Sequence, residues 1–375
     1  MIELRMERIG NELCVILPDE RAYSIVEEGR GVREKFWLKR VSTKFVKYDE
    51  KLKNISMLFK FNRNLKSCED WGEICASLIA RKVGLPCVEY HSAKLIGEDG
   101  SDMGNGVLCG NYKHNDREVE YSGFSLQSAH KNFQYDNCRG KKIDGLNTVE
   151  GFVEALKVVF RGQLSDNEIT EVRNELIKQA IFDFLLAQTD RHWLNTTFLL
   201  FEHGGSLHVR KSDAYDNGCI ALLKRKAAAI DGMSKEIGKL GKDSPYLRQQ
   251  LSNYCPMFGL KTSNVVIDDR VRGGDIERVK VFDPQHGREA FLQEMAEEIL
   301  YNPEIAVFFK NIEIKMREST LMKSVVRDLE ASGENPPPYV IKMINDVMGH
   351  QFDILNERVQ TRLAEINGVC RKEEM

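Results

Sequence analysis

The sequence has no long apolar run, and this absence limits where the protein can work. No window approaches the roughly 18 consecutive apolar residues that a membrane-spanning helix needs. The opening segment, MIELRMER, also lacks the apolar core of a secretory signal peptide. We therefore expect a cytoplasmic protein without a membrane span, and the sequence leaves open whether it is delivered into a host cell.

Paired cysteine motifs and an excess of positive charge are also missing. The nine cysteines are scattered without a Cys-x-x-Cys pair, and Cys75 and Cys219 lie in apolar segments. This pattern favours free thiols in a reducing compartment over a disulfide framework or a zinc site. The formal net charge of −3 differs from the basic balance of general nucleic-acid binders, so direct nucleic-acid binding is not expected.

What is present is typical of a soluble globular protein. Apolar residues make up 42% of the 375-residue chain and charged residues 30%, a balance unlike that of disordered chains. Internal repeats and low-complexity tracts are not evident. A chain of this length has enough residues for two or three domains, or for one two-lobed enzyme.

The most informative segment has two aspartates and an asparagine at spacings that fit phosphoryl transfer. Asp190 and Asn195 are five positions apart, and Asp216 precedes a turn at Asn217-Gly218. Asp190 can orient an attacking hydroxyl and take its proton, so it is the candidate catalytic base. Asn195 and Asp216 offer the hard oxygen ligands that Mg²⁺ prefers when it bridges the phosphates of ATP.

The elements expected around this segment would bring the two metal-ligand candidates together. A helix should begin at the capping box of residues 165–168 and end shortly before the candidate base. An apolar strand over residues 198–201 follows, and a turn at Gly204-Gly205 returns the chain as a second strand. Asn195 and Asp216 would then lie at the same end of two paired strands.

The spacing of Asp190 and Asn195 is a weak signal when taken alone. Asp190 could cap a turn and Asn195 could be an ordinary loop residue. The second aspartate and the matching order of elements favour the catalytic interpretation. His192, between them, is expected to hold the loop in place as a structural residue.

The first third of the chain is expected to form strands with one helix. Short β-branched or aromatic runs predict strands at residues 14–17, 22–26, 35–41, 55–61, 88–95 and 106–112. A helix is predicted from about Glu69 to Val83, because apolar residues recur there at helical spacing and Gly84-Leu85-Pro86 ends it.

A glycine-containing loop between two of these strands could approach a phosphate. Gly29 and Gly31 would let backbone N–H groups come close to it, and Arg33 and Lys35 would add positive charge. A plain hairpin turn explains the same residues, so the position of the loop ahead of the next lysine-bearing strand carries the argument.

Lys60 lies in the strand expected at residues 55–61. Protein kinases hold the α- and β-phosphates of ATP with a strand lysine paired to a glutamate of the next helix. Glu73 is the candidate partner, and Glu69 and Asp70 compete for that role. The alternative is an exposed lysine at a sheet edge.

Taken together, these residues resemble the HipA-like bacterial serine/threonine kinases. The matching motifs are Trp71-Gly72-Glu73, Ala76-Ser77, Ala80, Gly84-Leu85-Pro86, Asp183, Thr189-Asp190-Arg191-His192, Asn195 and Tyr215-Asp216-Asn217-Gly218. The resemblance extends over residues 29–218 and weakens beyond them. It implies an α+β, two-lobed, protein-kinase-like fold, with a β-rich N-terminal lobe over residues 1–112 and a larger helical C-terminal lobe over residues 113–375.

The resemblance also implies roles, position by position. Residues 31–35, Val32 among them, would form the phosphate loop, and Lys60 would be the phosphate lysine. Asp190 would be the catalytic base, with Asn195 and Asp216 as Mg²⁺ ligands. ATP and Mg²⁺ are the implied cofactors, and Ser or Thr of a protein, including this protein itself, is the implied acceptor.

Two features depart from the best-known members of that family. They carry a phosphorylatable serine just before the phosphate loop, where this chain has Glu28, and their N-terminal subdomain is longer than the leader before Ala22. The chain therefore resembles the shorter branch, and no toxin–antitoxin pairing follows from it.

Other functions share parts of this pattern. Lipid kinases also use an Asp-Arg-His-x-x-Asn loop, so a lipid or small-molecule kinase is the enzymatic alternative, and a pseudokinase acting as a binding module is the other. Lys224, Arg225 and Lys226 follow the metal-ligand segment, where kinases receive substrate, and could hold an acidic protein substrate. A solvated basic turn is the simpler interpretation. The substrate, the autophosphorylation site and the oligomeric state do not follow from the sequence.

Overall fold

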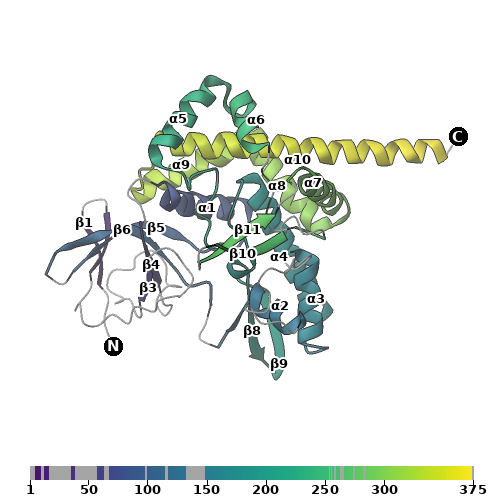
Figure 1. Ribbon diagram of the computed structural model, residues 1–375, viewed down its shortest axis with the longest axis horizontal. Coiled ribbons are helices and arrows are strands. Elements are labelled where there is room, and N and C mark those ends of the chain that lie inside the picture. Colours follow the sequence, from purple (N-terminus) through teal and green to yellow (C-terminus); the bar gives the residue numbers. More distant parts are fainter. Residues whose placement is uncertain are drawn as a thin grey trace. The chain divides into compact units, whose positions relative to one another are not determined.

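The structure of the protein is a computed structural model (Figure 1). The described residues are 5–9, 12–16, 35–38, 57–62, 67–97, 99–114, 117–131, 148–252, 254, 256, 259–261, 266–272, 275–281 and 284–373. The expected strand at residues 22–26 lies outside them, as do Gly29, Gly31, Val32 and Arg33.

The chain divides into two compact units. The first unit comprises Met1–Asp116, Asp213–Lys235 and Ser319–Met343, and the second comprises Arg117–Ser212, Glu236–Glu318 and Ile344–Met375. The first unit thus adds two later segments to the N-terminal part of the chain. The sequence prediction had assigned both of these segments to the C-terminal lobe.

A six-stranded sheet forms the β-rich part of the first unit. Its order is β1 (Arg5–Ile9), β2 (Glu12–Ile16), β5 (Tyr90–Ile96), β6 (Asp102–Cys109), β4 (Met57–Phe61) and β3 (Lys35–Leu38). Neighbouring strands are antiparallel except β2 and β5. The sequence prediction missed β1 and placed β5 and β6 a few residues from their observed bounds, because element ends carry the weakest sequence signal.

Strand β4 has neighbours on both sides, and this explains its composition. It pairs with β3 through Lys35 opposite Lys60, and with β6 through Lys60 opposite Val107. The apolar run from Met57 to Phe59 is buried, as expected for an inner strand. Lys60 is therefore not an exposed edge lysine.

Helix α1 (Glu69–Val83) confirms the predicted helix at both ends. Acidic residues occupy its first turn and basic residues its last, which suits the helix dipole, and Gly84 ends it with a left-handed φ of 86°. Helix α9 (Thr320–Ser332), from the C-terminal part of the chain, packs against it. Lys82 pairs with Asp328 at 2.6 Å across this contact. The first unit also contains most of α5 (Ala227–Ile237) and the first residues of α10 (Pro338–Glu373).

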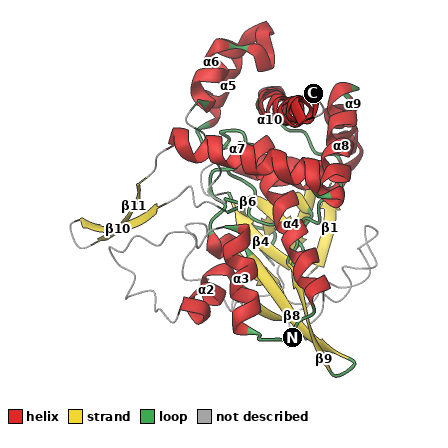
Figure 2. Ribbon diagram, turned by 90° about the vertical axis from the view of Figure 1, so that its right-hand side faces the viewer, coloured by secondary structure: helices red, strands yellow, loops and turns green. Residues whose placement is uncertain are grey.

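The second unit is mainly helical (Figure 2). Its helices are α2 (Gly123–Lys131), α3 (Val149–Val159), α4 (Asp166–Leu185), α6 (Pro245–Leu251), α7 (Pro284–Tyr301), α8 (Pro303–Arg317) and the rest of α10, with 3₁₀ turns η4 (Trp193–Asn195) and η5 (Gly238–Asp243). Strands β7 (Val119–Ser122), β8 (Thr197–His203) and β9 (Ser206–Lys211) form one antiparallel sheet, and β10 (Val266–Arg272) and β11 (Asp275–Val281) form another.

Helix α4 begins and ends as its sequence predicts. The hydroxyl of Ser165 accepts the N–H of Glu168, whose side chain returns to the N–H of Ser165, so the capping box is confirmed. After the helix ends, Ala187 adopts a left-handed φ of 49°, and this turn redirects the chain towards Asp190. None of the helices in the described parts of the chain combines the length and apolarity needed to cross a bilayer.

Candidate active site

In the first unit, the side chain of Lys60 is surrounded by three oxygen atoms. Its Nζ lies 3.2 Å from Oε1 of Glu73, 3.3 Å from Oδ1 of Asp216 and 3.4 Å from the hydroxyl of Tyr90. The side chains of Lys60 and Glu73 are only 6% and 1% exposed, whereas that of Asp216 is 43% exposed. The expected pairing of Lys60 with Glu73 is therefore present, and Asp216 joins it.

The charges around Lys60 keep its ammonium protonated. Burial is the largest single influence and by itself lowers the pKa of Lys60, but Glu73, Tyr90 and Asp216 together outweigh it. The pKa of Lys60 consequently lies well above its ordinary value. A permanently charged ammonium with one accessible neighbour is suited to binding phosphate oxygens.

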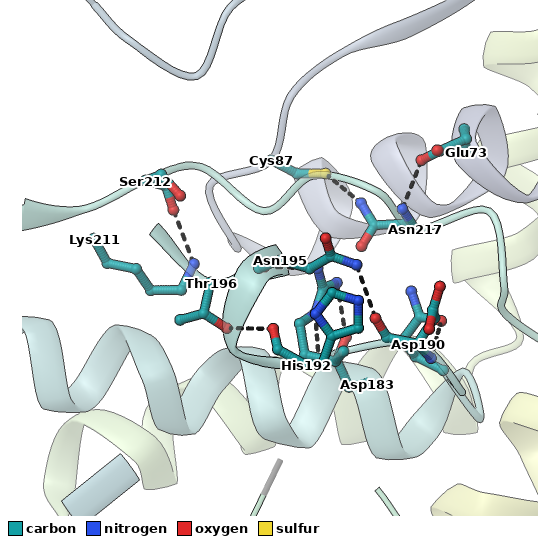
Figure 3. A network of polar contacts seen from close by, with 12 residues as sticks. Glu73, Cys87, Asp183, Asp190, His192, Asn195, Thr196, Lys211, Ser212 and Asn217 are labelled. Atoms are coloured by element: carbon teal, nitrogen blue, oxygen red, sulfur yellow. Dashed lines mark hydrogen bonds and ion pairs between the residues drawn. The ribbon is translucent and has the colours of Figure 1, made fainter. Parts of the chain in front are cut away.

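Two backbone N–H groups hold the segment that carries Asp216. The N–H of Asp216 donates to the hydroxyl of Tyr90 at 3.1 Å, and that of Asn217 donates to Oε2 of Glu73 at 2.6 Å. Figure 3 shows Asn217 between Glu73 and Cys87, whose Sγ accepts from the Asn217 amide at 3.5 Å. Glu73 therefore binds Lys60 with one oxygen and the metal-ligand segment with the other.

Two glycines allow this segment to approach α1 closely. A Cβ added at Gly72 would lie 2.6 Å from the carbonyl oxygen of Gly218, which is closer than real Cβ contacts. A Cβ added at Gly218 would lie 3.0 Å from the carbonyl oxygen of Glu69. The absence of both side chains lets the helix and the segment pack backbone to backbone next to Glu73.

In the second unit, a buried ion pair fixes the loop of the candidate base. Arg191 donates from Nε and Nη2 to the two carboxylate oxygens of Asp183 at 2.9 and 3.2 Å, and both side chains are 1% exposed. Burial raises the pKa of Asp183, and the charge of Arg191 only partly opposes that increase. His192 accepts the N–H of Leu194 with its Nδ1 at 3.2 Å, which confirms its structural role.

Asp190 and Asn195 are brought together by this loop. The side-chain amide of Asn195 donates to the carbonyl oxygen of Asp190 at 2.9 Å (Figure 3), and the N–H of Asp190 donates to Oε1 of Gln188 at 3.2 Å. Because its nitrogen is engaged in this way, Asn195 can present Oδ1 as a ligand. The hydroxyl of Tyr254 donates towards the carbonyl of Gln188 at 3.1 Å and braces the turn.

The candidate metal ligands suit Mg²⁺ in its usual binding mode. In the part of the chain that the structure describes, His, Cys, Asp and Glu side chains form no group of three or more that could hold a metal ion. Mg²⁺ is commonly bound by one or two protein oxygens together with substrate phosphates and water, so it needs no such group. The carboxylate of Asp216 and the amide oxygen of Asn195 are the hard donors that this mode requires.

The remaining candidate residues are Lys35 and the three consecutive cations at positions 224–226. Lys35 is the first residue of β3, directly opposite Lys60 in the strand register. Lys224, Arg225 and Lys226 are exposed in the first unit, where the backbone of Lys226 pairs with that of Ser67 just before α1.

The sequence matches no protein-family model and no curated protein. Among solved structures, it is similar to the crystal structure of the Helicobacter pylori proinflammatory kinase CtkA, with 14% identity, 84% of this chain and 89% of that chain covered, and a TM-score of 0.52. HipA of Shewanella oneidensis MR-1, solved with HipB and operator DNA, matches with 10% identity, 88% of this chain and 66% of that chain covered, and a TM-score of 0.43. The similarity to the first structure confirms, at the level of the fold, an α+β, protein-kinase-like architecture.

Proposed function

We propose that the protein is an ATP- and Mg²⁺-dependent kinase that transfers the γ-phosphoryl group to Ser or Thr of a protein, including itself. One observation carries the proposal. The buried ammonium of Lys60 contacts Glu73 and the half-exposed carboxylate of Asp216. A lysine placed between a fixed glutamate and a candidate metal ligand is the arrangement with which protein kinases hold MgATP.

Each group has a distinct task in this proposal. Lys60 binds the α- and β-phosphates of ATP, and the candidate phosphate loop of residues 31–35 would contribute further donors. Asp190 accepts the proton of the attacking hydroxyl and orients it. Bound Mg²⁺ would neutralise charge on the phosphates.

Asn195 and Asp216 would share that ion, and the chain path supports this assignment. Strand β8 begins at Thr197, just after Asn195, and its antiparallel partner β9 ends at Lys211, just before the segment of Asp216. The two candidates thus flank the same end of one hairpin in the sequence.

We also propose that the substrate is an acidic protein segment. Three consecutive cations follow the metal-ligand segment and are exposed. An acidic segment, or a phosphorylated residue of the protein itself, could pair with them, because Arg offers two parallel donors to a carboxylate or phosphate.

Incubation with labelled ATP and Mg²⁺, followed by mass spectrometry of the protein and of a cell lysate, tests the function. We expect label on Ser or Thr. Asp190→Ala should keep nucleotide binding and lose turnover, because a base acting on the hydroxyl stabilises mainly the transition state. Asp216→Ala should lose the Mg²⁺-dependent part of ATP affinity, whereas Asp231→Ala, at an exposed α5 pair with Lys235, should behave as wild type.

The same experiment separates the alternatives. Label on a lipid or another small molecule alone would replace the protein-kinase proposal with a small-molecule kinase. ATP binding without transfer would identify a pseudokinase. Unchanged ATP affinity in Asp216→Ala with Mg²⁺ present would contradict its role as a metal ligand.

A further inference from the structure

Tyr90 lies beside the metal-ligand segment because the chain just before β5 is paired with it. The N–H of Val88 donates to the carbonyl of Ala214 at 2.9 Å, and the N–H of Ala214 donates to the carbonyl of Pro86 at 2.9 Å. Tyr90 follows as the first residue of β5 and is 2% exposed. Its side chain is therefore held at a fixed distance from Asp216 by backbone pairing.

The hydroxyl of Tyr90 contacts both the ammonium of Lys60 and the backbone of Asp216. It accepts the backbone N–H of Asp216 at 3.1 Å and the ammonium of Lys60 at 3.4 Å. The ammonium also lies 5.2 Å from the centre of the Tyr90 ring, within the range of a cation–π interaction. One neutral oxygen thus joins the candidate phosphate lysine to the backbone of the candidate metal ligand.

Asp216 needs such support because of its backbone conformation. Its φ of 56° lies in the left-handed region, which residues other than glycine rarely adopt. A conformation of this kind persists only where the surroundings hold it. Two side chains do so here, since Tyr90 binds the N–H of Asp216 and Glu73 binds that of Asn217.

We propose that Tyr90 is a positioning residue, whose hydroxyl fixes the backbone of Asp216 and so orients the carboxylate that would bind Mg²⁺. This inference rests on the proposed function. The Tyr90 hydroxyl lies between the ammonium of Lys60 and the backbone N–H of Asp216 and accepts from both. Lys60 keeps its two carboxylate partners without Tyr90, and the effect of losing the hydroxyl should fall mainly on Asp216.

The test compares Tyr90→Phe with Tyr121→Phe, whose ring packs edge-on against Phe160 in the second unit. Removing one hydrogen bond to the Asp216 backbone should raise the Mg²⁺ concentration for half-maximal turnover roughly three- to tenfold. ATP binding in EDTA should change little, because it depends on Lys60. Hydrogen exchange of the Asp216 amide should accelerate by a similar factor, and this measurement does not depend on activity.

The outcomes distinguish a failure of the Tyr90 proposal from a failure of the proposed kinase function. Unchanged Mg²⁺ dependence and unchanged amide exchange in Tyr90→Phe would overturn the positioning role while leaving the proposed kinase function intact. A wild-type protein without Mg²⁺-dependent ATP binding or turnover would overturn both.

If Tyr90→Phe does not fold, a second variant tests the same role. Site-specific 3-fluorotyrosine at position 90 keeps the ring and the hydroxyl but weakens the oxygen as an acceptor. A rise in the half-saturating Mg²⁺ concentration would then support the role, and wild-type behaviour would overturn it.

Discussion

Among the described residues, each unit has an ion pair whose two side chains are almost fully buried, and the two pairs are built differently. In the first unit, the ammonium of Lys60 divides its contacts among Glu73, Asp216 and Tyr90. In the second, the guanidinium of Arg191 places two parallel donors on the two oxygens of Asp183. Lysine is a point charge whose donors can be redirected, whereas arginine is a rigid planar fork.

This difference matches the task proposed for each pair. One partner of Lys60, the carboxylate of Asp216, is 43% exposed, so an incoming phosphate or metal ion can compete for the contact. The side chains of Asp183 and Arg191 are 1% exposed, and their ion pair ties the loop of Asp190 to the end of α4. The first pair can therefore change partners during a reaction, and the second serves as a permanent support for the candidate base.

The largest expected effect comes from breaking the permanent pair. Arg191→Met leaves the carboxylate of Asp183 buried without its charge partner, and such losses cost about 3–5 kcal/mol of unfolding free energy. Urea unfolding measures the change. Arg81→Met is the control, because its pair with Glu89 is largely exposed and such pairs contribute only about 0–1 kcal/mol.

The same variant should depend on pH in a defined direction. The pKa of Asp183 is already raised in the folded protein, so its protonated form favours folding. That contribution is complete below the unfolded pKa and is lost as pH rises through the folded pKa. Without Arg191 the folded pKa rises further, and the deficit of Arg191→Met should shrink between pH 7.5 and pH 5. A deficit that grows on acidification would contradict this account.

The adjustable pair should respond mainly in catalysis. Lys60→Met should lower kcat/KM for ATP about 100- to 1,000-fold, as expected for the loss of a charge aimed at the phosphates. Lys60→Met should lower the free energy of unfolding less than Arg191→Met does. The reason is that the carboxylate of Glu73 would still accept the backbone N–H of Asn217. Lys94→Met, at a partly exposed pair with Asp102 in the same sheet, should retain activity. Equal losses of stability in Lys60→Met and Arg191→Met would remove the contrast between the pairs.

Local patterns were sufficient to predict several elements. The bounds of α1, the capping box of α4 and the β8–β9 hairpin depend on short-range signals, namely helical spacing, terminal residues and paired glycines. The pairing of Lys60 with Glu73 was predictable because a strand followed by a helix has few ways to place the two residues. That pairing is present at 3.2 Å.

Long-range packing explains what the sequence did not predict. Tyr90 had no local feature to mark it apart from other strand aromatics, since its role depends on a contact with Asp216, 126 residues later. The assignment of residues 319–343 to the first unit depends on the packing of α9 against α1, which no periodicity reveals.

A smaller effect is expected at Gly72 in α1, where close packing and helix propensity favour different residues. Alanine is favoured over glycine within a helix by about 1 kcal/mol. At Gly72, however, its Cβ would lie 2.6 Å from the carbonyl oxygen of Gly218, and overpacking of this kind costs about 1–3 kcal/mol. Gly72→Ala should therefore raise KM for ATP and lower the thermal midpoint. Gly232→Ala in α5, where a Cβ meets nothing within 4 Å, should raise the midpoint. A gain in both variants would show that α1 and the metal-ligand segment are not closely packed.

The smallest expected effect concerns the exposed cations that follow the metal-ligand segment. Replacing Lys224, Arg225 and Lys226 with Gln should raise KM for an acidic protein substrate a few-fold, because exposed charge pairs contribute about 0.2–1 kcal/mol each. ATP binding should be unchanged, since the side chains of Lys60 and Glu73 are buried and are not part of this exposed run. The effect should also shrink at high salt, which screens exposed charges. Wild-type kinetics of the triple variant at low salt would show that these three residues form a solvated turn without a role in substrate binding. A loss of ATP binding would instead show that these residues support α1 through the pairing of Lys226 with Ser67.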